Sequence, residues 1–207
     1  LISQPDMGTL IVVTMLAISL YFFAGAKLSQ FFIMMLVLAV LLGALAVAEP
    51  YRFDRLKAFL NPTVDTQDTS YHINQALLGI GAGGLFGRGF GQSQQKFNYL
   101  PEPVGDSIFS IFVEELGFAG AAVLLSLFTW LILAITAVAR RTHNEFAKLL
   151  VAGVAVWIGG QAFVNIAAIS GLIPLTGVPL PFISFGSSSL VSVMAGLGIV
   201  ANISKHA

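Results

Sequence analysis

The sequence predicts an all-α integral membrane protein with five transmembrane helices and one large loop between the second and the third. Of its 207 residues, 57% are hydrophobic and only 10% are charged, whereas soluble domains carry about 25% charged residues. The mean hydropathy is +0.88. The apolar residues also come in uncharged runs of about 20 residues, which is the length of an α-helix that crosses a bilayer.

Four uncharged stretches hold the five predicted helices. Residues 9–26 and 28–48 form the first two, and each is followed by a charged residue. Residues 116–139 form the third helix, which we expect to begin several residues earlier. Residues 149–204 hold two more helices, because prolines in this stretch would disrupt one continuous helix. These prolines are Pro174, Pro179 and Pro181.

Short loops that carry Lys and Arg predict how the chain crosses the membrane. Lys27 follows the first helix, Arg140 and Arg141 follow the third, and Lys205 lies in the C-terminal tail. With five helices these three points fall on one side, and the positive-inside rule makes that side cytoplasmic. The large loop, residues 49–107, would then be extracytoplasmic.

Two short helices are predicted inside this loop. Residues 50–61 ("PYRFDRLKAFLN") place Phe53, Leu56 and Leu60 on one face, as in a helix that lies on the membrane surface. Residues 71–80 ("YHINQALLGI") form the second.

Three glycines in the loop, Gly79, Gly81 and Gly84, match the G-x-G-x-x-G pattern of dinucleotide-binding sites. That pattern requires a preceding strand and a following helix, and the sequence predicts no strand here. We therefore expect these glycines to allow tight turns and a close approach of backbones.

Asp106 precedes a long apolar stretch and has two interpretations, which are compatible. It can cap the third helix, because Asp is favoured at that position and suits the helix dipole. It can also act as a general base or a metal ligand at the mouth of a membrane cavity. Asp6 precedes the first helix on the same predicted side, and the same alternatives apply to it.

Four further polar residues lie inside the predicted helices. Glu114 and Glu115 follow Asp106 by about 12 Å along a helix and lie about 80° and 180° from its face. They are either supports for helix packing or functional groups, as ionisable residues in a membrane often are. Gln161 and Asn165 are one turn apart in the fourth helix, where amides usually hold neighbouring helices together.

The start of the fifth helix and the large loop supply further candidates. Ser187, Ser188 and Ser189 cap that helix or line a polar groove. The basic residues of the loop either anchor lipid headgroups and form ion pairs, or bind an anion such as a diphosphate, for which Arg is well shaped. They are Arg52, Arg55, Lys57, Arg88 and Lys96.

Composition argues against other site classes. The chain has no cysteine, which excludes disulfides and thiol chemistry. Its three histidines are scattered along the sequence, which argues against a histidine metal cluster. The formal net charge of zero implies no nucleic-acid partner. The sequence indicates no Ser-His-Asp arrangement.

Five stretches, in matching order and spacing, carry a resemblance to a known family. They are "QPDMGT", "FFAGAKL", "AEPYRFDRLKAFLNP", "GGLFGRGFGQSQQKFNYLPEPVGDSIFSIFVEELGF" and "GVPLPFISFGSSSL". The chain resembles the C-terminal part of the SEDS family of membrane peptidoglycan glycosyltransferases, over nearly its whole length. "AGAKL" and "AEPYR" are more similar to the division and sporulation branch, FtsW and SpoVE, than to RodA, the near alternative.

The resemblance implies a fold of about ten transmembrane helices, of which this chain would supply the last five as one SEDS-type domain over residues 1–207. It implies an enzyme of the bacterial cytoplasmic (inner) membrane that polymerises lipid II into glycan strands during cell division. The 4-hydroxyl of the acceptor sugar attacks the anomeric carbon of the donor chain, and undecaprenyl diphosphate leaves. The implied partners are a class B penicillin-binding protein and other division proteins.

The resemblance also assigns residue roles. Asp106 would deprotonate the attacking hydroxyl or hold a divalent cation, Mg or Mn, and Asp6 matches another important acidic position. Two local departures affect the expected geometry: the family usually reads Thr-Asp-Phe around Asp106 and Ser-Tyr-Gly-Gly where this chain has residues 184–187. Because active-site residues of the family also come from its first half, this chain alone is expected to be an incomplete enzyme.

Two other functions compete with the glycosyltransferase. A flippase or another transporter of lipid-linked precursors would place its site near the membrane midplane, commonly with broken helices and inverted repeats. The predicted spans are almost free of ionisable groups, and the sequence shows no repeat. A non-catalytic scaffold that recruits division proteins would not depend on Asp106.

Overall fold

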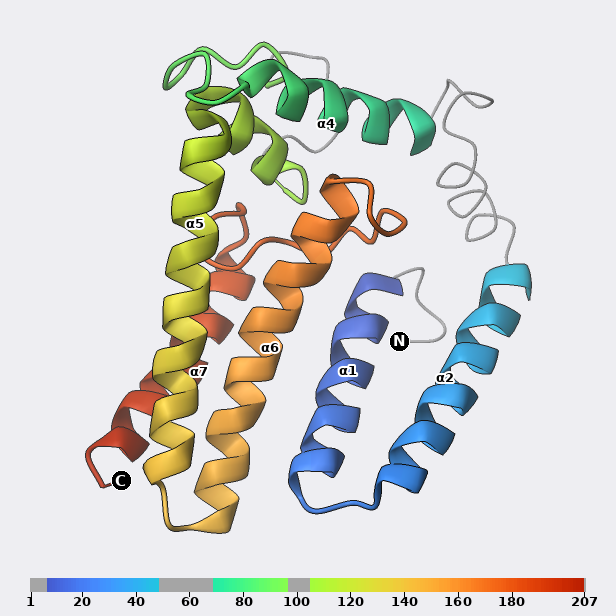
Figure 1. The fold of residues 1–207 in the computed structure, drawn as a ribbon, viewed down its shortest axis with the longest axis vertical. Helices are drawn as coiled ribbons and strands as arrows, with labels where there is room; N and C mark the ends of the chain where they lie inside the picture. Colours follow the sequence, from blue (N-terminus) through green and yellow to red (C-terminus); the bar gives the residue numbers. More distant parts are fainter. Residues whose placement is uncertain (1–6, 49–68, 97–104, 207) are drawn as a thin grey trace.

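The computed structural model describes residues 7–48, 69–96 and 105–206, and the elements in these ranges are helices (Figure 1). They are α1 (Met7–Phe23), α2 (Leu28–Ala48), α4 (Thr69–Gly83), α5 (Ile108–Arg141), α6 (Glu145–Ile169) and α7 (Ser187–Ser204). The all-α prediction is therefore confirmed, and α2 has the predicted bounds. The predicted surface helix at 50–61 lies outside the described residues.

Three of the described helices, α5, α6 and α7, are long and apolar enough to cross a membrane. In α1 and α2 the apolar segments found within the described residues are shorter, Gly8–Phe23 and Leu28–Val37. The structure thus shows a membrane protein with several spans. The number of five crossings stays a prediction.

The ends of the helices are arranged as the charge pattern predicts. The α1–α2 turn, the α5–α6 turn and the C-terminus lie at one end of the molecule, and α4 lies across the opposite end (Figure 1). The three short basic segments that contain Lys27, Arg140 and Lys205 therefore share one end. Which side of a membrane this end faces stays a prediction.

Helix α6 is the centre of the fold, because it packs against α5, α1 and α7. Val151 and Ile158 on α6 and Val193 on α7 are completely buried. Glycines let the neighbours approach: a Cβ on Gly160 would lie 1.7 Å from the Met15 side chain of α1. Small residues at helix contacts are typical of packing inside membranes.

Helix α5 begins well before its apolar stretch, as expected, but it is not continuous. Gly117 has φ 70° and ψ −168°, values outside the helical region, which divides α5 into a first segment up to 116 and a long apolar segment after it. Helix α4 packs across α5. The chain around Asp106 therefore lies where α4, the first segment of α5 and the C-terminal end of α6 meet.

Candidate active site around Asp106

Asp106 is held by its backbone. Its carbonyl oxygen accepts a hydrogen bond from Asn165 Nδ2 at 2.7 Å, and the same nitrogen donates to the Val178 carbonyl oxygen at 2.7 Å. Asn165 lies on α6 and is only 1% exposed. One buried amide thus joins α6, the residue before α5 and the Pro-rich loop between α6 and α7.

The side chain of Asp106 has two differently placed oxygens. Oδ1 accepts a hydrogen bond from Ser107 Oγ at 3.2 Å. Oδ2 lies on the side of the Pro-rich loop, 3.9 Å from where a Cβ on Gly177 would be. The carboxylate is half-buried. Oδ2 is therefore the oxygen that a ligand between Asp106 and the loop would meet.

The capping role predicted for Asp106 is wrong. The N-cap of α5 is Ser107, and its hydroxyl makes no capping hydrogen bond to the helix. The helix begins one residue later than a cap at Asp106 would require, and the Ser107 hydroxyl is directed to Asp106 instead. The Asp106 carboxylate is therefore not the group that closes the helix end.

A histidine that sequence analysis left out lies beside this pair. His72 Nε2 of α4 is 2.5 Å from Ser107 Oγ. Ser107 is completely buried. A row of His72, Ser107 and Asp106 is thus formed, although the sequence indicated no such arrangement. Only the adjacency of Ser107 to Asp106 could have pointed to it, because His72 comes from a separate helix.

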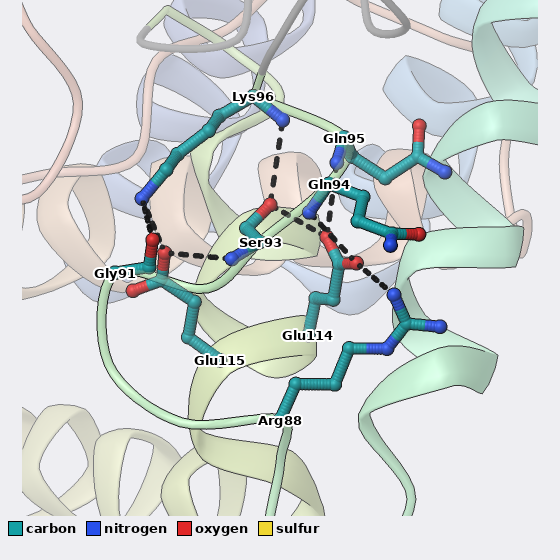
Figure 2. A network of polar contacts seen from close by, with 8 residues as sticks. All are labelled: Arg88, Gly91, Ser93, Gln94, Gln95, Lys96, Glu114 and Glu115. Atoms are coloured by element: carbon teal, nitrogen blue, oxygen red, sulfur yellow. Dashed lines mark hydrogen bonds and ion pairs between the residues drawn. The ribbon is translucent and has the colours of Figure 1, made fainter.

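Glu114 is the most enclosed carboxylate in the described residues. It is 1% exposed and lies on the first segment of α5. It accepts hydrogen bonds from Ser93 Oγ at 2.5 Å, Gln94 N at 3.1 Å and Gln95 N at 3.3 Å, and Arg88 Nη1 lies at 3.3 Å (Figure 2). A buried carboxylate is tolerated when its oxygens are bonded in this way.

Glu115 binds the same loop from the next position. Its Oε1 atom accepts hydrogen bonds from Lys96 Nζ at 2.9 Å and from Ser93 N at 3.3 Å (Figure 2). Lys96 Nζ also donates to the Gly91 carbonyl oxygen at 2.7 Å. Glu114 and Glu115 therefore attach the loop 88–96 to α5, which is a contact with a loop and not the predicted packing of helices.

Two of the predicted basic residues take part in these contacts. Arg88 and Lys96 form ion pairs with Glu114 and Glu115, as one alternative predicted. Binding of an anion by these two residues stays a prediction. Asp6, Arg52, Arg55 and Lys57 lie outside the described residues.

The backbone of the glycine-rich loop pairs with the break in α5. Arg88 N and Gly89 N donate to the carbonyl oxygens of Glu114 and Glu115 at 2.9 and 3.0 Å. A Cβ on Gly87 would lie 2.1 Å from the Glu115 carbonyl oxygen, and Gly87 has φ +77°. This close approach occurs at Gly87 and not at the three glycines for which it was predicted: Cβ atoms on Gly81 and Gly84 would meet nothing within 4 Å, although Gly84, at φ +51°, does form a turn. The pairing explains why α5 is interrupted here.

Both amides of α6 bind the Pro-rich loop, and Asn165 also joins α6 to the start of α5 through the Asp106 carbonyl oxygen. Gln161 Nε2 donates to the Pro179 carbonyl oxygen at 3.0 Å, one turn from the Asn165 contacts. The Pro-rich loop offers backbone carbonyls that its prolines prevent from joining a helix. The amides therefore fix this loop in front of Asp106.

Two of the three serines at the start of α7, Ser188 and Ser189, line a cavity, whereas Ser187 is not among its lining residues. The predicted alternative was a polar groove, and this cavity is mostly apolar. Gly186, not a serine, is the N-cap of α7, which begins at Ser187. Ser188 and Ser189 line a cavity of about 600 Å³ between α1, α6 and α7, together with Gln161 and Pro179. The other lining residues are mostly apolar. Such a cavity suits an amphipathic molecule.

The described residues do not form a metal site by themselves. Within 7–48, 69–96 and 105–206, no group of three or more His, Cys, Asp or Glu side chains could hold an ion. Divalent cations such as Mg²⁺ take several oxygen ligands. Asp106 would therefore need further ligands from a bound diphosphate, water or other residues.

The model of the family described as "Cell cycle protein", which groups FtsW, RodA and SpoVE, matches residues 1–207. The chain belongs to the FtsW/RodA/SpoVE family. Curated relatives of this family include the "Probable peptidoglycan glycosyltransferase FtsW" of Coxiella burnetii, 40% identical over 98% of this chain and 55% of the relative. "Stage V sporulation protein E" of Bacillus subtilis is 40% identical over 98% of this chain and 56% of the relative.

Solved structures agree with this family fold. One, described as "Structural coordination of polymerization and crosslinking by a peptidoglycan synthase complex", superposes with a TM-score of 0.79 at 28% identity, over 98% of this chain and 56% of that one. A mutant of the rod shape determining protein RodA of Thermus thermophilus superposes with a TM-score of 0.62 at 29% identity, over 98% and 51%. The chain spans about half the length of the family members it matches.

Proposed function

We propose that this chain is the part of a peptidoglycan glycosyltransferase that supplies the catalytic aspartate. The enzyme would polymerise lipid II into glycan strands during cell division and release undecaprenyl diphosphate. One observation carries the proposal: Asp106 is fixed by Asn165 and Ser107, while Oδ2 faces the Pro-rich loop. A general base requires such a fixed carboxylate with one accessible oxygen.

Asp106 Oδ2 then takes the proton of the acceptor 4-hydroxyl. As the hydroxyl oxygen bonds to the anomeric carbon of the donor chain, the bond from that carbon to the diphosphate oxygen breaks. The bonding electrons leave with undecaprenyl diphosphate, and the proton stays on Asp106. A carboxylate near such a reaction raises the rate by about 10²–10⁴-fold when it is well placed.

Substrate binding is proposed from two features. The cavity lined by Ser188 and Ser189 has an apolar wall for a lipid chain and hydroxyls for a sugar or phosphate. The charge on the diphosphate requires cations. Because Arg88 and Lys96 are already paired with carboxylates, Arg52, Arg55 and Lys57 are the better candidates, with a divalent cation as an alternative.

The partners and the cellular place follow from the same proposal. A solved structure of similar fold is described as a synthase complex that coordinates polymerization and crosslinking. This supports a class B penicillin-binding protein as the partner, because that class supplies crosslinking. The protein would lie in the bacterial cytoplasmic membrane, with α4 and Asp106 on the extracytoplasmic side, where glycan strands are made.

The test is polymer formation from labelled lipid II by the full-length protein with its partner. Asp106→Asn keeps the shape and removes the base, so we expect polymer to fall by about 10²-fold or more. Glu145→Gln is the control, because Glu145 lies at the other end of the molecule and is exposed. Full activity of Asp106→Asn would contradict the proposal.

The same protein in liposomes separates the two rival functions. A lipid II flippase would move fluorescent lipid II between leaflets whether or not polymer forms. A scaffold would support division in a depletion strain even as Asp106→Asn. Neither result is expected from a polymerase whose base is Asp106.

A further inference from the structure

In the row of His72, Ser107 and Asp106, the positions of the hydrogen atoms determine which residue donates a hydrogen bond to the next. A serine hydroxyl carries one hydrogen, and an ionised carboxylate can only accept. Ser107 donates its hydrogen to Asp106 Oδ1 at 3.2 Å. It therefore has none to give to His72, whose Nε2 lies 2.5 Å from the same Oγ. This direction requires a hydrogen on Nε2 of His72, which the ring donates to Ser107.

We propose that His72 and Ser107 are positioning residues, which hold Asp106 Oδ1 and so leave Oδ2 as the oxygen that accepts the proton from the substrate. This inference rests on the proposed function, because it assigns a role in the step that Asp106 performs. Neither residue touches the reacting atoms. Each acts through the next one in the row.

The surroundings give this row its rigidity. Ser107 is completely buried, so its hydroxyl has few alternative orientations. The backbone of Asp106 is fixed from the opposite side by Asn165 Nδ2 at 2.7 Å. With both the main chain and Oδ1 held, rotation of the carboxylate is restricted. Oδ2 then stays towards Gly177 and the space in front of the Pro-rich loop.

A matched control lies one turn further along α5. Ser110 is also completely buried and also joins α5 to α4, through a hydrogen bond from its Oγ to the Ala76 carbonyl oxygen at 3.0 Å. It is four residues from Asp106 and bonds to a backbone carbonyl. Ser110→Ala therefore removes a comparable buried contact between the same two helices and leaves the row intact.

The kinetic test compares full-length variants with their partner on labelled lipid II. We expect Ser107→Ala and His72→Leu to lower kcat by about ten- to a hundredfold, with KM changed less than about twofold. The double variant should be no slower than the slower single variant, because the two residues act in one row. His72→Gln, whose amide can donate to Ser107, should recover part of the loss.

Ser110→Ala separates positioning from packing. It should lower the thermal midpoint about as much as Ser107→Ala does, with kcat within about twofold of wild type. Equal losses of kcat in Ser107→Ala and Ser110→Ala would overturn the proposal, as would additive losses in the double variant. If the wild type itself makes no polymer, the proposed function fails, and this is seen before any variant is compared.

A second measurement does not use activity. Nitrogen NMR of histidine-labelled full-length protein reports which ring nitrogen carries hydrogen, and His72→Gln identifies the signal. We expect hydrogen on Nε2 of His72, and a shift of that signal in Ser107→Ala but not in Ser110→Ala. A ring with hydrogen on Nδ1 alone would overturn the proposal, because Ser107 would then donate to His72 and not to Asp106.

Discussion

The Asn165 side-chain nitrogen lies 2.7 Å from the carbonyl oxygen of Asp106 and 2.7 Å from that of Val178. This single atom connects the candidate base to the loop in front of it. The amide orientation is determined by its neighbours, because both of them are acceptors and only the nitrogen can donate. The contact explains how a residue in an apolar helix shapes a site at the helix end.

Substitution of Asn165 should destabilise the protein. Asn165→Leu leaves two buried carbonyl oxygens unpaired, at about 1–3 kcal/mol each, partly offset by removal of Oδ1, which is buried and lacks a partner in the described residues. Asn165→Asp should destabilise the protein more, because a carboxylate oxygen would then face the two carbonyl oxygens and could not donate to either. Gln161→Leu, which loses one such bond, is the control. Thermal unfolding in detergent measures the stability of each variant. If Gln161→Leu lowers the unfolding midpoint as much as Asn165→Asp does, the prediction is contradicted.

The pair of glutamates should control the order of the loop 88–96. Glu114→Gln weakens four contacts of a buried carboxylate, and hydrogen bonds to charged groups are worth about 1.5–3 kcal/mol each. Amide hydrogen exchange of this loop should therefore rise more in Glu114→Gln than in Glu115→Gln. Glu145→Gln breaks an exposed pair with Lys148 and should have almost no effect. Unchanged exchange in Glu114→Gln would show that the loop is held by other contacts.

Two glycines should not tolerate alanine. Gly87→Ala sets Cβ 2.1 Å from the Glu115 carbonyl oxygen, and Gly117→Ala sets it 2.3 Å from Gly87 N. Both clashes are with backbone, so we expect losses of at least about 2 kcal/mol. Gly81→Ala in α4 meets nothing within 4 Å and should stabilise by up to about 1 kcal/mol. The midpoint of thermal unfolding should fall in Gly87→Ala and Gly117→Ala and rise in Gly81→Ala. An unchanged midpoint in Gly117→Ala would argue against the break in α5.

Gly177 tests the space in front of Asp106. Gly177→Ala has the backbone cost of a residue at φ +73° and adds a methyl group 3.9 Å from Asp106 Oδ2. Gly171→Ala has a similar cost at φ +71° but faces Leu77 and Ile73 side chains. We expect similar midpoints for the two variants and a lower polymerisation rate for Gly177→Ala alone. Equal rates would place the substrate elsewhere.

The helical membrane fold is predictable from composition and charge. The bounds of α2 and the grouping of the basic turns at one end are confirmed. The start of α5 before its apolar stretch was also expected. The break at Gly117 was not, because a glycine in an apolar helix usually indicates close helix packing, and only the pairing with residues 84–89 shows its other role.

Asp106 was singled out from its position, and the resemblance gave it a role, but its surroundings were not predictable. His72 and Asn165 reach it from two other helices, and Glu114 and Glu115 bind residues about twenty positions earlier in the chain. The capping role failed for the same reason: the hydroxyl and carboxylate at this helix start have partners in space that compete with the helix end.

Partition into a membrane depends on the sum of side-chain transfer energies along each segment, which is a property of the sequence read in one dimension. The partner of a buried polar group depends on which distant segment folds back onto it. Sequence therefore determines that this chain is a bundle of membrane helices with an aspartate at the end of one of them. Only the tertiary structure decides that Asn165 and Ser107 hold this aspartate, and that the glutamates hold the loop beside it.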